Sequence, residues 1–152
     1  MILYLDASAL AKSYISESGT AEVRRAIGEA DAAGTHVISR AEVSAALAKA
    51  VRMDALREEE AAGCLARFRK DWQDLIRLGM SELLIAHADA LAWSYGLRGY
   101  DAVHLAAADL WQDALGESVT FAVFDGKLWH AARELGLRPY PENPHVQRKR
   151  RS

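Results

Sequence analysis

The chain has 152 residues, of which 51% are hydrophobic and 26% charged, and its formal net charge is −2. This length and composition are typical of one soluble globular domain and exclude a fibre, a repeat array and a disordered chain. The sequence has no apolar run of the ~18 residues that span a membrane and no signal peptide, so we expect a cytoplasmic protein with no membrane partner. A single cysteine, Cys64, excludes an internal disulfide bond and is consistent with a reducing compartment.

The basic residues are concentrated at the C-terminus. The segment RKRR at 148–151 holds four of the 19 lysines and arginines, and all the acidic residues precede it. The rest of the chain is therefore acidic, which argues against a broad basic surface for nucleic acid. An acidic site that recruits divalent cations is still compatible with RNA, because the metal can bind the phosphates. We expect a folded domain over residues 1–140 and an extended basic tail over 141–152.

Short apolar segments alternate with helical segments along the chain. Segments rich in Ile, Leu, Val and Phe predict strands at 2–5, 36–39, 75–78 and 119–124. Apolar residues at helical spacing predict helices that include 43–51, 61–72, 84–95 and 103–110. This alternation predicts an α/β fold, in which helices cover both faces of a parallel sheet. Beyond Pro139 the repeated prolines cannot continue a helix, so we expect an extended arm.

Acidic residues follow the predicted strands. Asp6 and Asp125 come directly after the first and fourth strands, Glu42 follows the second, and Asp101 opens a helix. Because the carboxyl ends of parallel strands meet at one edge of a sheet, we expect these carboxylates to converge there. Each acid also has a simpler interpretation, since Asp caps helices and any acid near a helix N-terminus is stabilised by the helix dipole. Both interpretations stay open at this point.

Converging carboxylates favour one kind of chemistry. Two of them about 4 Å apart repel by roughly 4 kcal/mol at an effective dielectric near 20, so a cluster needs protons or cations. Oxygen ligands without thiolates or a histidine pair favour Mg²⁺ or Mn²⁺ over zinc. A carboxylate-bound Mg²⁺ typically acts on phosphates, where it activates a water molecule and stabilises the departing oxygen.

Four motifs carry a resemblance to a known family. The segments YLDASALAK, ISRAEVSAAL, GYDAVHLAAA and FAVFDGKLW, in this order, resemble the motifs of the PIN domain, and specifically those of the VapC toxins of VapBC toxin–antitoxin pairs. The resemblance covers residues 1–140. It implies a three-layer α/β/α fold with a central parallel sheet in strand order 3-2-1-4-5.

The resemblance also implies an activity and partners. It assigns Asp6, Glu42, Asp101 and Asp125 to an acidic, catalytic metal-binding quartet, with Ser8 as an accessory hydroxyl beside the first acid. The implied activity is that of an endoribonuclease dependent on Mg²⁺ or Mn²⁺. The implied partners are a VapB-like antitoxin, an RNA substrate and a second copy of the chain in a homodimer.

Some features depart from this pattern or leave alternatives. Many relatives carry Thr or Ser two residues before the fourth acid, where this chain has Val123, so Asp125 is the weakest member of the quartet. His104 follows Asp101 by three residues, and we expect it to be packed and hydrogen-bonded at the helix start rather than to bind metal. The alternative functions are a catalytically silent PIN module that binds RNA or protein, and a phosphatase with Asp6 as nucleophile. The phosphatase would require a second Asp where Ser8 stands.

Overall fold

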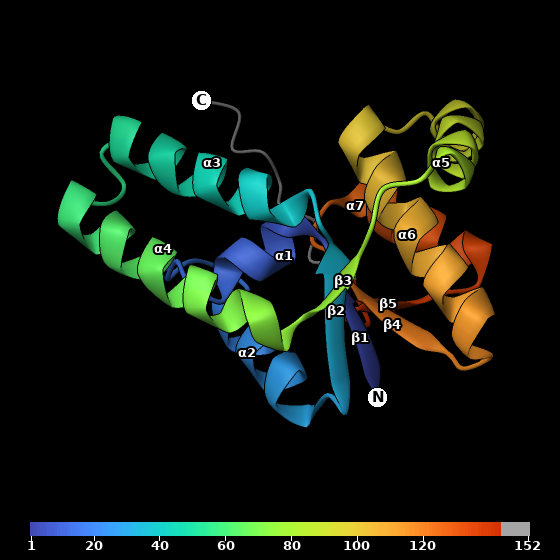
Figure 1. Cartoon of the computed structure of the whole chain (residues 1–152), viewed down its shortest axis with the longest axis horizontal. Coiled ribbons are helices and arrows are strands. Elements are labelled where there is room, and N and C mark those ends of the chain that lie inside the picture. Colours follow the sequence, from blue (N-terminus) through green and yellow to red (C-terminus); the bar gives the residue numbers. More distant parts are fainter. Residues whose placement is uncertain (144–152) are drawn as a thin grey trace.

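The computed structural model describes residues 1–143, which form a sheet between two layers of helices (Figure 1). The described strands are β1 (Ile2–Leu5), β2 (Ala32–His36), β3 (Ile76–Leu78), β4 (Val119–Ala122) and β5 (Arg138–Tyr140). All neighbouring strands are parallel, and their order across the sheet is β3-β2-β1-β4-β5. The α/β/α fold and the strand order 3-2-1-4-5 are therefore confirmed.

The two helical layers come from the two halves of the chain. Figure 1 shows α1 to α4 on one side of the sheet and α5 to α7 on the other. The first layer consists of α1 (Ala7–Lys12), α2 (Thr20–Glu29), α3 (Ser39–Arg52) and α4 (Glu58–Asp71), followed by the 3₁₀ turn η1 (Trp72–Asp74). The second consists of α5 (Glu82–Tyr95), α6 (Gly99–Leu115) and α7 (Gly126–Leu135). The four helices predicted from apolar spacing are all present.

The central strand β1 explains how the two layers are joined. Its side chains alternate between the faces: Leu3 and Leu5 pack in the core that includes Phe68 of α4, and Tyr4 packs in the core that includes Phe121 and the helices α5 to α7. A strand buried on both faces is expected at the centre of a parallel sheet. The end of β1 is consequently a buried position, and Asp6 occupies it.

The predicted second strand was wrong. The prediction at 36–39 followed the β-branched residues of HVISR, whereas β2 is the segment AAGTH at Ala32–His36, and α3 already begins at Ser39. Tertiary packing overrides the low strand propensity of Ala and Gly here. A Cβ atom on Gly34 would lie 2.8 Å from Cη2 of Trp111, so α6 packs closely on β2 only because this residue has no side chain.

The C-terminal part differs in detail from the prediction. The fourth strand ends at Ala122, two residues earlier than expected, although the Val123 amide still donates to the Tyr140 carbonyl at 3.0 Å. The expected extended arm begins as β5, which pairs with β4. The basic end of the predicted tail, residues 144–152, lies outside the described residues. Within residues 1–143, none of the helices is long and apolar enough to cross a membrane.

Candidate metal-binding site

Asp6 lies between the central strand β1 and α1, directly after the last residue of β1. Its backbone is extended, and its Oδ1 atom accepts a hydrogen bond of 2.8 Å from the amide of Ala9. Asp6 is thus a helix N-cap, as the simpler interpretation predicted. The cap uses one carboxylate oxygen of a side chain that is only 5% exposed. Capping and metal binding therefore do not exclude each other at this residue.

The charge on Asp6 is unfavourable in its surroundings. The pKa of Asp6 is raised from 3.8 to about 6, mainly by burial and in smaller part by the nearby carboxylates of Asp101 and Glu42. The neighbouring His104 and the hydrogen bond from Ala9 oppose this shift without cancelling it. A buried carboxylate whose pKa is raised by desolvation and by like charges is typical of functional sites.

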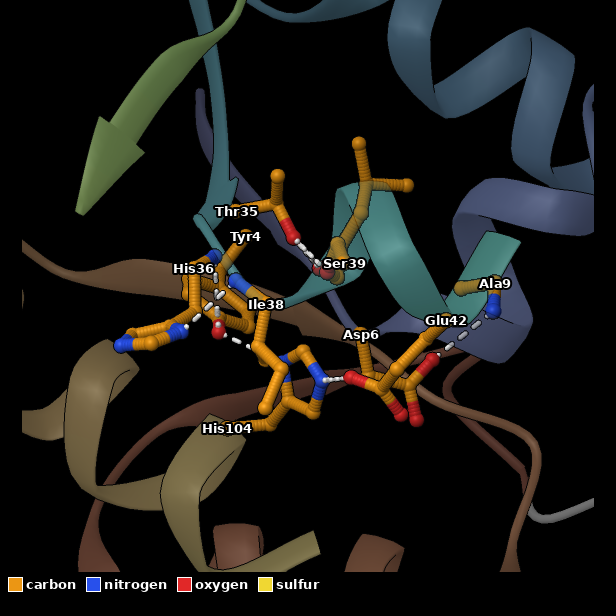
Figure 2. A network of polar contacts seen from close by, with 10 residues as sticks. Tyr4, Asp6, Ala9, Thr35, His36, Ile38, Ser39, Glu42 and His104 are labelled. Carbon is orange, nitrogen blue, oxygen red and sulfur yellow. Dashed lines mark hydrogen bonds and ion pairs between the residues drawn. The ribbon is translucent and has the colours of Figure 1, made fainter. Parts of the chain in front are cut away.

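Glu42 reaches the same place from the neighbouring strand. It lies in the first turn of α3, which follows β2. Its Oε1 atom lies 2.7 Å from Nε2 of His104, a residue of α6 that is 2% exposed. Figure 2 shows the carboxylates of Asp6 and Glu42 next to each other, with the His104 ring against them. Two strands and a helix from the second half of the chain therefore meet at this point.

Asp101 and Asp125 lie on the more exposed side of the cluster. Arg98, the N-cap residue of α6, donates from Nε to Oδ2 of Asp101 at 3.1 Å, and its Nη2 lies 4.0 Å from Oδ2 of Asp125. Asp125 also caps α7, since its Oδ1 accepts from the amide of Leu128 at 2.9 Å. One guanidinium thus bridges the two outer acids, and its hydrogen bond with Asp101 raises the pKa of Arg98.

Ser8 and Val123, the two other positions singled out in the sequence, differ in burial. Ser8 lies on α1 two residues after Asp6, and its side chain is exposed. Val123, two residues before Asp125, is fully buried in the core beneath α5 to α7. A residue at this position faces the core, so its hydrophobic nature fits its surroundings.

Sequence reasoning missed one residue and underrated another. The hydroxyl of Tyr4 lies 2.7 Å from Nδ1 of His104, and Figure 2 shows Tyr4 on the opposite side of the His104 ring from Glu42. The apolar pattern of the first strand gives Tyr4 no special role. Its hydroxyl is nevertheless a signal, because a hydroxyl in a strand buried on both faces needs a hydrogen-bond partner. His104 is packed and hydrogen-bonded, as expected, but its partner is one of the acids.

The donor chemistry fits a hard divalent cation. Carboxylate oxygens are the preferred protein ligands of Mg²⁺ and Mn²⁺, and a cation would relieve the unfavourable charge of Asp6. Within residues 1–143, no three acidic, histidine or cysteine side chains are arranged closely enough to hold a metal ion as they stand. The reason is that Glu42 turns to His104 and Asp101 turns to Arg98. Binding an ion would require these side chains to turn from their present partners.

The comparisons with known proteins agree with this geometry. The sequence matches the PIN domain family over residues 3–133. It is 37% identical over 145 residues to ribonuclease VapC45 of Mycobacterium tuberculosis (strain CDC 1551 / Oshkosh), an alignment that covers 92% of this chain and 95% of the relative. It is 34% identical over 109 residues to ribonuclease VapC3 of Pyrobaculum aerophilum, covering 72% and 82%. The chain therefore belongs to the PIN domain family, in the branch that contains the VapC proteins.

A solved structure supports the same fold. A chain from a toxin–antitoxin complex of Klebsiella pneumoniae superimposes with a TM-score of 0.62 at 19% identity, over 84% of this chain and 89% of that chain. At this level of identity the similarity concerns the fold. It agrees with the parallel sheet in strand order 3-2-1-4-5 described above.

Proposed function

We propose that this protein is the toxin of a VapBC pair and an endoribonuclease that depends on Mg²⁺ or Mn²⁺. The observation that carries the proposal is the position of Asp6, a buried carboxylate with an elevated pKa at the carboxyl end of the central strand, next to Glu42 and Asp101. The names of the VapC relatives support RNA as the substrate. RNA cleavage inside the cell agrees with a single, free cysteine.

Each acid has a distinct part in this proposal. Asp6, Glu42 and Asp101 would hold the cation, and Asp125 would contribute from the rim, where its side chain is 46% exposed. A bound Mg²⁺ or Mn²⁺ supplies an activated water for attack on phosphorus and stabilises the departing oxygen. The cap hydrogen bond from Ala9 keeps the Asp6 carboxylate in one orientation. Ser8, exposed beside it, is placed to meet the substrate phosphate from α1.

The activity is tested with the full chain purified free of antitoxin. Incubation with structured RNA should give cleavage in Mg²⁺ or Mn²⁺ and none in EDTA. A catalytically silent PIN module would bind RNA without cleaving it, and a phosphatase would instead release phosphate from small phosphoesters. Intact RNA in the presence of either metal would therefore reject the proposed activity.

The proposed partner is a VapB-like antitoxin. The toxin–antitoxin complex among the solved structures of this fold supports it. We expect an amphipathic segment of the antitoxin to fill an apolar groove. A hollow of about 370 Å³ beside α1, lined by Leu10, Ile27 and Leu75, is one such groove. Expression of the wild type without antitoxin should arrest growth, and expression of an equally abundant Asp6→Asn variant should not.

We also propose that the protein forms a homodimer. Helix α5 presents large apolar side chains to solvent, among them Leu83 and Trp93, the latter 90% exposed. Large apolar side chains exposed on one helix are typical of an interface between protein chains. Sedimentation of the wild type should give the mass of two chains, and the double variant Leu83→Lys, Trp93→Glu should give the mass of one.

A further inference from the structure

Tyr4 and His104 lie behind the acidic cluster, and their arrangement bears on how Glu42 is held. The Glu42 side chain is 27% exposed, so packing does not fix it in one rotamer. Its Oε1 atom has one neighbour that can do so, Nε2 of His104 at 2.7 Å. A carboxylate that is already fixed loses less conformational entropy when it binds a cation.

The direction of each hydrogen bond follows from the partners of the Tyr4 hydroxyl. The backbone amide of His36 lies 3.2 Å from this hydroxyl and can only donate, so the Tyr4 oxygen accepts there. The proton of Tyr4 is then free for Nδ1 of His104, 2.7 Å away. We assign this proton to the bond with Nδ1, so that Nδ1 accepts and the ring carries its own proton on Nε2, facing Glu42. Successive donors thus lead from the His36 amide through Tyr4 and His104 to the carboxylate.

Tyr4 and His104 form a hydrogen-bond relay to Glu42, and the Tyr4 end of this relay is held by tight packing. Tyr4 is fully buried in β1, and its ring stacks on Phe121 with the ring centres 5.3 Å apart. Trp111 packs against it edge-on at 6.5 Å. Neither ring of the relay can turn away without disrupting the core beneath α6.

We propose that Tyr4 and His104 are positioning residues for Glu42: the relay directs the Nε2 proton of His104 at Oε1 of Glu42 and leaves Oε2 available to a divalent cation. This inference rests on the function proposed above, because it assigns Glu42 to the same cation site as Asp6. The pattern is that of a second group which orients a metal-binding side chain and thereby tunes the site. Neither Tyr4 nor His104 is required to touch the cation or the RNA.

Two amide variants separate positioning from a purely structural role. In His104→Gln the amide nitrogen reaches about as far as Nε2 and can still donate to Glu42. In His104→Asn the shorter amide reaches only about as far as Nδ1, on the Tyr4 side. Both replace a buried ring by a buried amide, so the loss of packing is common to them.

The chain also offers a matched control. His87 of α5 and Asp109 of α6 form a second histidine–carboxylate pair, with Nε2 2.7 Å from Oδ2. Asp109 lies eight residues beyond Asp101, roughly 12 Å along the helix. The variant His87→Asn removes an equivalent hydrogen bond away from the acidic cluster.

Three measurements test the proposal on the full chain: Mn²⁺ affinity by calorimetric titration, the rate of cleavage of structured RNA, and the ¹⁵N shifts of the His104 ring without metal. We expect His104→Asn to weaken Mn²⁺ binding about 10- to 100-fold and to slow cleavage in parallel. His104→Gln should remain within a few-fold of the wild type, and His87→Asn should bind Mn²⁺ as the wild type does. The ring shifts should show a proton on Nε2 and none on Nδ1.

The contrary outcomes are distinct. A proton on Nδ1, or equal Mn²⁺ affinities for the wild type, His104→Asn and His104→Gln, overturns the positioning role and leaves the proposed function standing. Equal weakening in the Asn and Gln variants likewise assigns His104 to the core and not to Glu42. A wild type that binds no Mn²⁺ rejects the proposed function, and the positioning role with it.

Discussion

The acidic cluster has two halves that the protein holds in different ways. The inner half consists of Asp6 and Glu42 with His104, and the outer half consists of Asp101 and Asp125 with Arg98. In the inner half the hydrogen bonds come from the Ala9 amide at the start of α1 and from the buried His104 ring of α6. In the outer half the shared cation is Arg98, a side chain that is 80% exposed.

This difference shows how burial decides what an acidic residue does. In the interior the dielectric is low, so desolvation and like charges shift the pKa of Asp6 strongly. At the surface, water and salt screen the ion pairs of Arg98, and such pairs contribute little to stability. We therefore expect substitutions in the inner half to change metal binding and stability more than substitutions in the outer half.

The largest expected effect comes from Asp6→Asn. Asn caps a helix about as well as Asp, so α1 should keep its start. Loss of the buried carboxylate should reduce metal-dependent RNA cleavage by more than about 100-fold, beyond what loss of an orienting neighbour costs. Mn²⁺ should raise the melting temperature of the wild type clearly and that of Asp6→Asn much less, because a ligand that binds the folded state stabilises it.

The matched control for this experiment is Asp113→Asn, which makes the same chemical change at an exposed position of α6. It should leave cleavage and the Mn²⁺ shift at wild-type values. Equal Mn²⁺ shifts in the wild type and in Asp6→Asn would leave Asp6 as a helix cap only, and the inner half would lose its proposed chemistry.

The second prediction concerns pH and uses the metal-free protein. The folded-state pKa of Asp6 is raised from 3.8 to about 6, so its contribution to stability is fully present below 3.8 and is lost as the pH rises through 6. Asp6→Asn lacks this titration. The free energy of unfolding of the variant minus that of the wild type should therefore increase by about 1 kcal/mol between pH 5 and pH 8. Denaturant unfolding of both proteins in EDTA measures it; a difference that stays constant over this range contradicts the prediction.

A smaller effect is expected in the outer half, at Asp125. The variant Asp125→Asn keeps the cap on the amide of Leu128 and removes only the rim charge, so cleavage should fall less than in Asp6→Asn and stability should hardly change. Asp125→Ala loses the cap as well and should be destabilised by about 1 kcal/mol. Thermal melts and cleavage rates of the two variants distinguish the effect of losing the helix cap from the effect of losing the carboxylate charge. Activity as low in Asp125→Asn as in Asp6→Asn would abolish the distinction between the halves.

The smallest expected effect on stability is that of Arg98→Ala. Its ion pairs are exposed, so the free energy of unfolding should change by less than about 0.5 kcal/mol. Mn²⁺ affinity should rise a few-fold, because the acids lose a competing cation. Arg57→Ala is the matched control, since Arg57 is an exposed N-cap residue paired with Glu60 in the same i,i+3 spacing. Weaker Mn²⁺ binding in Arg98→Ala would mean that the guanidinium helps to assemble the site.

The sequence by itself determined the fold class, four of the helices and the order of the acidic residues along the chain. Apolar spacing is a local property, and the four predicted helices follow from it because each buries one face against the sheet. The motif resemblance supplied the strand order, and the pairing of the five described strands confirms it. The placement of Asp6 and Asp125 as N-caps of the helices that follow β1 and β4 also follows from the sequence, although Val123 and Phe124 separate Asp125 from β4.

Only the tertiary structure decided the second strand and the surroundings of the acids. The weak strand former AAGTH becomes β2 because it pairs with both β1 and β3 and because Gly34 admits Trp111. The link from Tyr4 through His104 to Glu42 joins residues 100 and 62 positions apart. Local patterns do not encode contacts of this kind, because long-range hydrogen bonds form only after the sheet and both helical layers have packed around them.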